Sequence, residues 1–497
     1  MRTSTLSLVL RGLWLLGALP AGCATLSPGK PSSDAELGPL AAQPAEAVAG
    51  VQAAAWEHAK PTQSQSVTPA RADGPEPHKD HVAPPNVQVS TQTPLGIADL
   101  EQIALQNNPT LAQAAAQVDS SRARALQAGP YPNPTIGYSG DQMGINGTAG
   151  ELQGGFVEQT IVTAGKLRLS RAKYNQEATE AEIRVIEQQY RVLNGVRMRY
   201  YELLALQQMI NLHRNILSNA EESLLTHKEM YNTGQANKSE VLLAEIAVND
   251  AKIELHTLEN RYTAHWQHLT ALLGSPDLPP TPLKGQLTPE GPPLDWNCSL
   301  DRLLQQSPEL QAAQAHVVHD QITLRRERAE PIPDIQLRGV TGYNFESRNT
   351  VAGAEVGIRL PIWDRNQGTI REVQADLARS HAEVRRVELS LRKRLAEAYS
   401  RYQTAWNSST IYRDVSVPKA TEAYEVQLDM YKKRRVAWPH VVVYQRNMLE
   451  VKEKYTGSLL ALREAEVEIT GLLLVDGLSV PVLPSPGGHL ESNPKPR

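Results

Sequence analysis

The sequence contains two similar halves of about 200 residues, and this duplication constrains the fold more than any other feature. Each half has a helix start at Asn-Pro or Ser-Pro, a Pro-x-Pro break and a Met-Tyr pair, in the same order. The matching segments keep one register to within one residue, since 308 − 109 = 199 and 431 − 231 = 200: 108–111 with 307–310, 132–134 with 331–333, and 230–231 with 430–431. The chain is therefore predicted to fold as two copies of one structural unit.

The N-terminus has the pattern of an export signal. Residues 1–23 place Arg2 and Arg11 around a short apolar run and end in small residues and Cys23. Residues 19–23 resemble the cleavage site of bacterial lipoproteins, so Cys23 is predicted to be the site of lipidation. Ordinary cleavage after a small residue, without a lipid, is the alternative.

Composition sets the boundaries of the units. Residues 24–93 and 481–497 are rich in Pro and polar residues, and they are predicted to be a disordered tether and tail because they cannot bury enough apolar surface. The first repeat is assigned to 94–274, a Pro- and Gly-rich linker to 275–293, and the second repeat to 294–480.

In each half a strand pair is predicted after the Pro-x-Pro segment, because proline at alternate positions ends a helix and starts extended chain. The predicted strands are 135–140 and 152–159, joined by a loop at 141–150, and 334–343 and 353–360, joined by a loop at 344–350.

Long helices are predicted after each strand pair. Residues 164–231 contain no proline, and a continuous helix of that length would extend roughly 100 Å. Apolar residues recur in it every seven positions, as in a helix packed on neighbouring helices: Val196, Leu203, Ile210, Leu217 and Leu224. The other predicted elements are a turn at 232–237, helices at 239–273 and 368–431, a turn at 432–437, and a helix at 439–474. Pro418 is expected to kink the helix that contains it.

Four strands cannot close a sheet alone, because they leave two open edges and no lumen. Three copies that each donate four strands would close a twelve-stranded barrel of the outer-membrane kind. The predicted fold class is therefore α+β, mostly α: a trimeric 12-stranded outer-membrane β-barrel continuous with a long periplasmic α-helical barrel, with two internal repeats.

In these features the sequence resembles the outer-membrane efflux factor family, the TolC-like proteins, over residues 94–474. The segment 360–368, Leu-Pro-Ile-Trp-Asp-Arg-Asn-Gln-Gly, is similar to that of members paired with cobalt-zinc-cadmium-type and copper-type metal pumps. The resemblance implies a homotrimer in the outer membrane with a periplasmic extension. It also implies two partners, a periplasmic adaptor (membrane fusion) protein and an inner-membrane resistance-nodulation-division-type pump that supplies the energy.

The resemblance places functional residues at the two helix–helix turns, where family members meet adaptor hairpins. The implied adaptor-docking residues are Tyr231, Gly234 and Ser239 in the first turn and Tyr431, Arg434 and Arg435 in the second. The alternative interpretation is that these residues only close the helical hairpins.

A constriction at the tunnel tip is not carried over from the family. Members often use acidic residues on the helix after the second turn, but the matching positions here are His440 and Val443. The remaining candidates for a tip constriction are Glu240, Arg434 and Arg435.

Enzymatic and nucleic-acid-binding functions are not predicted. The sequence has no Gly-rich phosphate loop, His-Glu-x-x-His or Gly-x-Ser-x-Gly motif, and a net charge of -4 gives no general attraction to nucleic acid. No cofactor and no metal site are expected. His316 and His319, three residues apart on a predicted helix, are interpreted as ordinary helix residues.

The predicted function is export of heavy-metal cations as the outer-membrane channel of a tripartite pump. A drug or polypeptide export duct of the same fold is one alternative, and a structural periplasmic coiled-coil lipoprotein is another. A structural rod would have no use for strand pairs at equal positions in two repeats.

Overall fold

The computed structural model describes residues 94–141, 151–289 and 291–481. These residues lie in one compact unit, Val87–Arg497. Cys23, the predicted tether, the tail beyond residue 481 and most of the loop predicted at 141–150 lie outside the described residues.

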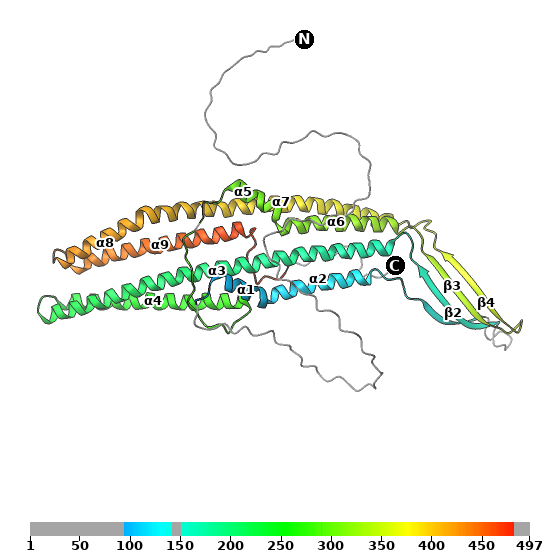
Figure 1. The fold of residues 1–497 in the computed structure, drawn as a ribbon, viewed down its shortest axis with the longest axis horizontal. Helices are drawn as coiled ribbons and strands as arrows, with labels where there is room; N and C mark the ends of the chain where they lie inside the picture. The colour runs from blue at the N-terminus through cyan, green and yellow to red at the C-terminus, as the bar shows by residue number, and fades with distance from the viewer. Residues whose placement is uncertain (1–93, 142–150, 290, 482–497) are drawn as a thin grey trace, which may run out of the picture. The chain divides into compact units, whose positions relative to one another are not determined.

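The same order of elements occurs twice, which confirms the internal duplication (Figure 1). The first half contains α1 (Ile97–Asn107), α2 (Pro109–Gln127), β1 (Thr135–Asp141), β2 (Leu152–Ile161), α3 (Lys166–Asn232) and α4 (Lys238–Leu273). The second contains α5 (Trp296–Gln306), α6 (Pro308–Ala329), β3 (Ile335–Asn344), β4 (Asn349–Ile358), α7 (Gln367–Ile411), the π-helix η2 (Tyr412–Ser416), α8 (Val417–Lys432) and α9 (Trp438–Thr470).

The predicted helix starts are confirmed at the caps. Asn108 is the N-cap of α2, with Pro109 in the first turn, and its side-chain oxygen accepts a hydrogen bond from the backbone N–H of Thr110. Ser307 and Pro308 occupy the same positions at the start of α6. Proline is tolerated there because the first N–H groups of a helix have no intrahelical acceptor.

Helix α3 is the central element of the packing. Its 67 residues contact α2, α4, α6 and α9, and Figure 1 shows α4 alongside it in the first half and α9 alongside α7 and α8 in the second. The heptad residues of α3 contribute to the core: Val196 and Leu203 are fully buried against residues of α4 such as Leu269. None of the helices in the described ranges has the length and apolarity needed to cross a bilayer.

Pro418 follows an irregular turn of its helix and does not end the helix. The five residues of η2 form a π-helix immediately before α8, which begins at Val417 with Pro418 in its first turn. A proline cannot donate to the carbonyl four residues earlier, and a π-helical turn is one way to accommodate the missing bond.

Two predicted boundaries differ from the structure by four residues. Strand β4 begins at Asn349, four residues earlier than expected, because the Asn344 side-chain oxygen accepts hydrogen bonds from the backbone N–H groups of Glu346 and Ser347 and closes a shorter turn. Helix α9 ends at Thr470 and not at residue 474. There the Asn194 side-chain amide donates to the carbonyls of Gly471 and Leu474, which holds a turn that a continued helix could not form.

The four strands form one antiparallel sheet in the order β1-β2-β3-β4. The two hairpins, one from each half, are joined by the pairing of β2 with β3, in which Gly154 lies opposite Gly342. A polar contact lies at the start of the long helix that follows each hairpin. Lys166 at the start of α3 pairs with Asp334 at 3.0 Å, and the Asn366 side chain before α7 donates to Glu327 at 2.7 Å.

Candidate functional site

One face of the sheet is apolar and exposed in the single chain. Ile136 pairs across the strands with Val157, and the same face continues to Val356 and Ile358 on β4. These side chains are between 50% and 77% exposed. An exposed apolar sheet face of this kind requires a lipid or protein environment.

The opposite face of the sheet carries a row of charged residues. Glu158, Arg338 and Glu355 lie side by side in one row across β2, β3 and β4. The Arg338 guanidinium also lies 4.6 Å from the centre of the Phe156 ring. Apolar residues on one face and charged residues on the other are the alternation of a sheet between lipid and water.

The first helix–helix turn joins α3 to α4. The Gly234 N–H donates to Tyr231 O at 3.0 Å and the Gln235 N–H donates to Met230 O at 2.8 Å. Gly234 has a φ of 71°, and no atom lies within 4 Å of where a Cβ would stand. Glycine is favoured here by its backbone conformation and not by lack of space.

The second turn, between α8 and α9, has the same backbone. The Arg434 N–H donates to Tyr431 O at 2.8 Å and the Arg435 N–H donates to Met430 O at 2.9 Å, two hundred residues after the equivalent bonds of the first turn. Arg434 takes the left-handed conformation with a φ of 59°. Arg434 and Arg435 are exposed, whereas Tyr431 is half-buried. The structure therefore presents the two arginines to solvent at the turn.

The remaining turn residues serve as helix caps. Asn237 is the N-cap of α4 and accepts from the Glu240 N–H at 3.0 Å, while the Glu240 carboxylate accepts from the Asn237 N–H at 3.3 Å. The Ser239 hydroxyl donates to the Asn237 side chain at 2.9 Å. The contacts of Glu240 thus give it a local structural role, whereas His440 and Val443 are exposed on α9.

Trp438 contacts residues beside both turns, and the sequence analysis did not predict this role. Its ring meets Tyr431 with centroids 5.0 Å apart and His227 of α3 with centroids 6.2 Å apart. The Trp-Pro pair that starts α9 was the available signal, because a large aromatic residue beside a tight turn needs a partner. The partner on α3 could not be read from the sequence.

Substitutions at the equivalent positions of the two turns are expected to have opposite effects on the stability of the turns. Gly234→Ala is expected to destabilise its turn by about 1 kcal/mol, and Arg434→Gly to stabilise its turn by about the same amount, because L-residues pay a cost in the left-handed region that glycine avoids. Hydrogen exchange of the turn amides measures both, with about fivefold faster and slower exchange expected. Shifts in the same direction would contradict the backbone argument.

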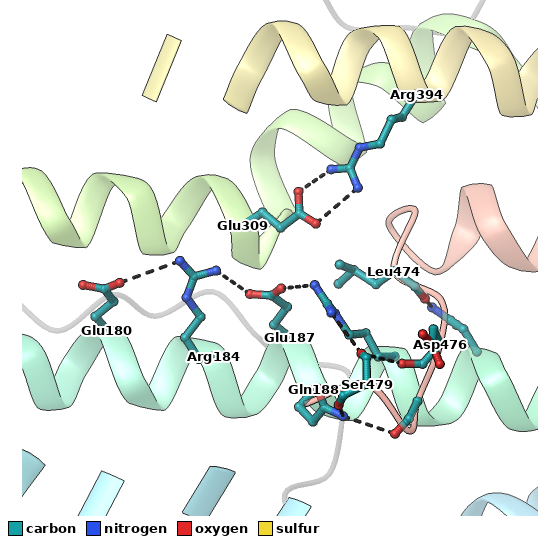
Figure 2. A network of polar contacts seen from close by, with 12 residues as sticks. Glu180, Arg184, Glu187, Gln188, Glu309, Arg394, Leu474, Asp476 and Ser479 are labelled. Carbon is teal, nitrogen blue, oxygen red and sulfur yellow. Dashed lines mark hydrogen bonds and ion pairs between the residues drawn. The ribbon is translucent and has the colours of Figure 1, made fainter. Parts of the chain in front are cut away.

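A second polar cluster lies in the first half of α3, and Figure 2 shows it at close range. Arg184 lies 3.7 Å from Glu180 and 2.7 Å from Glu187, and Arg191 lies 2.6 Å from the same Glu187 carboxylate. Glu187 is almost fully buried. Arg191 also donates to the Ser479 hydroxyl, which connects α3 to the segment after α9.

Comparisons with known proteins identify the family. Residues 100–275 and 299–434 match the family described as Outer membrane efflux protein. The cobalt-zinc-cadmium resistance protein CzcC of Cupriavidus metallidurans is 23% identical over 386 residues, covering 76% of this chain and 90% of its own length.

Solved structures share the fold. CusC superposes with a TM-score of 0.64 at 17% identity, covering 76% of this chain and 92% of CusC. The MtrE outer membrane channel of Neisseria gonorrhoeae, in its open state, superposes with a TM-score of 0.63 at 18% identity, covering 77% and 90%. Because the family match spans more than half of the sequence, the chain belongs to the outer membrane efflux protein family, and it is an outer-membrane efflux channel with a periplasmic helical extension rather than an enzyme.

Proposed function

We propose that the chain forms the outer-membrane duct of a tripartite pump that exports heavy-metal cations. The two-faced sheet is the observation that carries the duct, because its apolar face suits lipid and its polar face suits a water-filled passage. The metal cargo is supported by the CzcC relative, whose name refers to cobalt, zinc and cadmium resistance.

The open edges of the sheet support a homotrimer. Among the described strands, β1 and β4 each have one neighbour, so each leaves a row of backbone N–H and C=O groups without a strand partner there. Those groups must be paired inside a bilayer. Three copies that pair β4 of one with β1 of the next would close a twelve-stranded barrel, in which lipid on Cys23 would add an anchor.

The two turns are proposed to dock on a periplasmic adaptor that connects the duct to an inner-membrane pump of the resistance-nodulation-division type. The second turn carries four consecutive exposed cations, Lys432 to Arg435, and the first turn has none at the equivalent positions 232–235. A basic turn favours an acidic surface on the adaptor. Arg434→Glu with Arg435→Glu is therefore expected to weaken adaptor binding.

Growth of a deletion strain tests the proposal. With the gene removed, we expect sensitivity to some of zinc, cobalt, cadmium, nickel and copper, restored by the wild-type gene but less well by the Arg434→Glu, Arg435→Glu gene. Sensitivity only to drugs or detergents would assign a different cargo to the same duct. Unchanged growth on all of them would favour secretion or a structural role and would overturn metal export.

A further inference from the structure

Helix α6 carries two histidines and an aspartate on one face, directed toward α3 and α7. His319 and Asp320 lie three and four residues after His316, a spacing that brings each of their side chains close to that of His316 on a helix. His319 and Asp320 are buried, while the His316 side chain keeps 21% of its surface exposed. The group therefore has a buried interior and an opening to solvent.

The distances suit a single small cation. The His319 Nδ1 atom lies 3.1 Å from Asp320 Oδ1, His316 Nε2 lies 3.8 Å from Asp320 Oδ2, and one donor atom from each residue lies within 4.8 Å of the other two. Tetrahedral zinc with ligands at about 2.0–2.1 Å separates its ligand atoms by about 3.3 Å. Small rotations of the side chains would bring all three donors to that separation.

A carboxylate from a different helix orients one of the imidazoles. Glu180 of α3 lies 3.2 Å from His316 Nδ1, on the side of the ring away from Asp320, so it leaves Nε2 directed at the cluster. Arg184 holds Glu180 in turn, as Figure 2 shows. A carboxylate on the outer nitrogen of a histidine is the usual second partner in a metal site, because it fixes the tautomer and strengthens the ligand.

We propose that His316, His319 and Asp320 bind one divalent transition-metal ion of the zinc type, with Glu180 as a positioning residue and a fourth position open to water. Two imidazoles and one carboxylate favour Zn²⁺ and its neighbours over Mg²⁺ or Ca²⁺, which prefer oxygen ligands. The site goes beyond the proposed function, since it would hold its ion whatever solute the duct exports.

The chain contains its own control. His265 and His268 are also three residues apart on a helix, with ring centroids 6.0 Å apart, and His265 Nδ1 lies 2.8 Å from Glu202. Among the described residues, however, only the α6 group brings three potential ligands within the distance of one ion. Substituting this second pair removes two histidines and a histidine–carboxylate contact without touching the proposed site.

Zinc titration of the purified full-length protein, stripped with a chelator, tests the site by calorimetry and by competition with a chromophoric chelator. We expect His316→Ala and His319→Ala each to weaken one Zn²⁺ site per protomer by at least about tenfold, and Glu180→Gln to weaken it by about 10–100-fold. The His265→Ala, His268→Ala protein should bind as the wild type does. X-ray absorption of the zinc-loaded protein should give nitrogen and oxygen ligands at about 2.0–2.1 Å.

Equal zinc binding by the wild type, His316→Ala and His319→Ala would overturn the site, as would no binding by the wild type. Comparing variants removes contributions from the other histidines of the chain. Circular dichroism of the metal-free proteins identifies a variant that fails to fold, and Glu180→Gln, which keeps both imidazoles, then serves in its place. Because binding is measured on the purified protein, failure here leaves metal export untouched, and failure of the growth experiment leaves this site untouched.

Discussion

Gly342→Ala is expected to weaken the pairing of the two hairpins of the sheet and to lower the amount of folded protein in the outer membrane. A Cβ at Gly342 would stand 2.5 Å from the carbonyl oxygen of Gln153 and 2.9 Å from the Cα of Gly154. Both are backbone atoms of the neighbouring strand, so no side chain can rotate to make room. The same crowding recurs at Gly154, whose Cβ would lie 2.1 Å from Thr341 O.

The cost is set by how many contacts depend on this pairing. In the described sheet the two halves of the chain are joined only by β2 and β3, so moving these strands apart breaks the sheet between the repeats. Overpacking of a well-packed site costs about 1–3 kcal/mol. At the upper end of that range, about 3 kcal/mol per protomer corresponds to a folded population reduced roughly 100-fold relative to the unfolded one.

Protease resistance and heat-dependent gel mobility of isolated outer membranes measure the effect. Gly339→Ala is the matched control, because it lies three residues earlier on the same strand and its Cβ would meet no atom within 4 Å. The control should accumulate as the wild type does. Equal amounts of folded Gly342→Ala and Gly339→Ala protein would show that the strands can relax around the added methyl group.

Removing the Glu187 carboxylate is expected to cost about 3–5 kcal/mol, the loss typical of breaking a buried ion pair. Glu187 is 2% exposed and its carboxylate faces Arg184 and Arg191. The Nε atoms of both arginines have no hydrogen-bond partner among the residues that the structure describes, so the contacts to Glu187 are a large share of what compensates their burial. Among the described residues, Glu187→Ala leaves the Arg191 guanidinium with the Ser479 hydroxyl alone, while Arg184 keeps a longer contact to Glu180.

Thermal unfolding in detergent measures this loss against an exposed pair on α7. Arg386 and Glu383 lie 2.5 Å apart with side chains 68% and 44% exposed, so Glu383→Ala should change stability by less than about 1 kcal/mol. Glu187→Gln, which keeps one acceptor, should fall between the two. Similar unfolding temperatures for Glu187→Ala and Glu383→Ala would mean that water reaches the α3 arginines.

The features that sequence alone predicted are those set by local chemistry. Pro109 and Pro308 started helices where expected, Gly234 closed a turn, and the Pro-x-Pro segments preceded strands, because each depends on backbone preferences of a few neighbouring residues. The duplication strengthened the predictions of the helix starts and of the strands after Pro-x-Pro, because each of these signals occurs twice at one spacing.

The features that sequence did not predict depend on residues far apart in the chain. Spacing placed His316 and His319 on one face of a helix, but it could not show that Glu180 from another helix would approach the same imidazole. The contact of Gly154 with Gly342 likewise follows from the register between two hairpins, which no local pattern specifies. The short β3–β4 turn was missed because Asn344 was assigned to a loop and not to its turn-forming role.

The two turns share a backbone but differ in their side chains, and this has a consequence for symmetry. If three copies close into a ring, two kinds of turn alternate around its rim. The six turns then share one backbone conformation, but their side chains repeat with three-fold symmetry only. A partner that engaged every turn would have to tolerate two unlike surfaces, one basic and one not. A partner that demanded the basic surface could occupy every second position, so the number of bound partners would be set by the divergence of the repeats and not by the size of the ring.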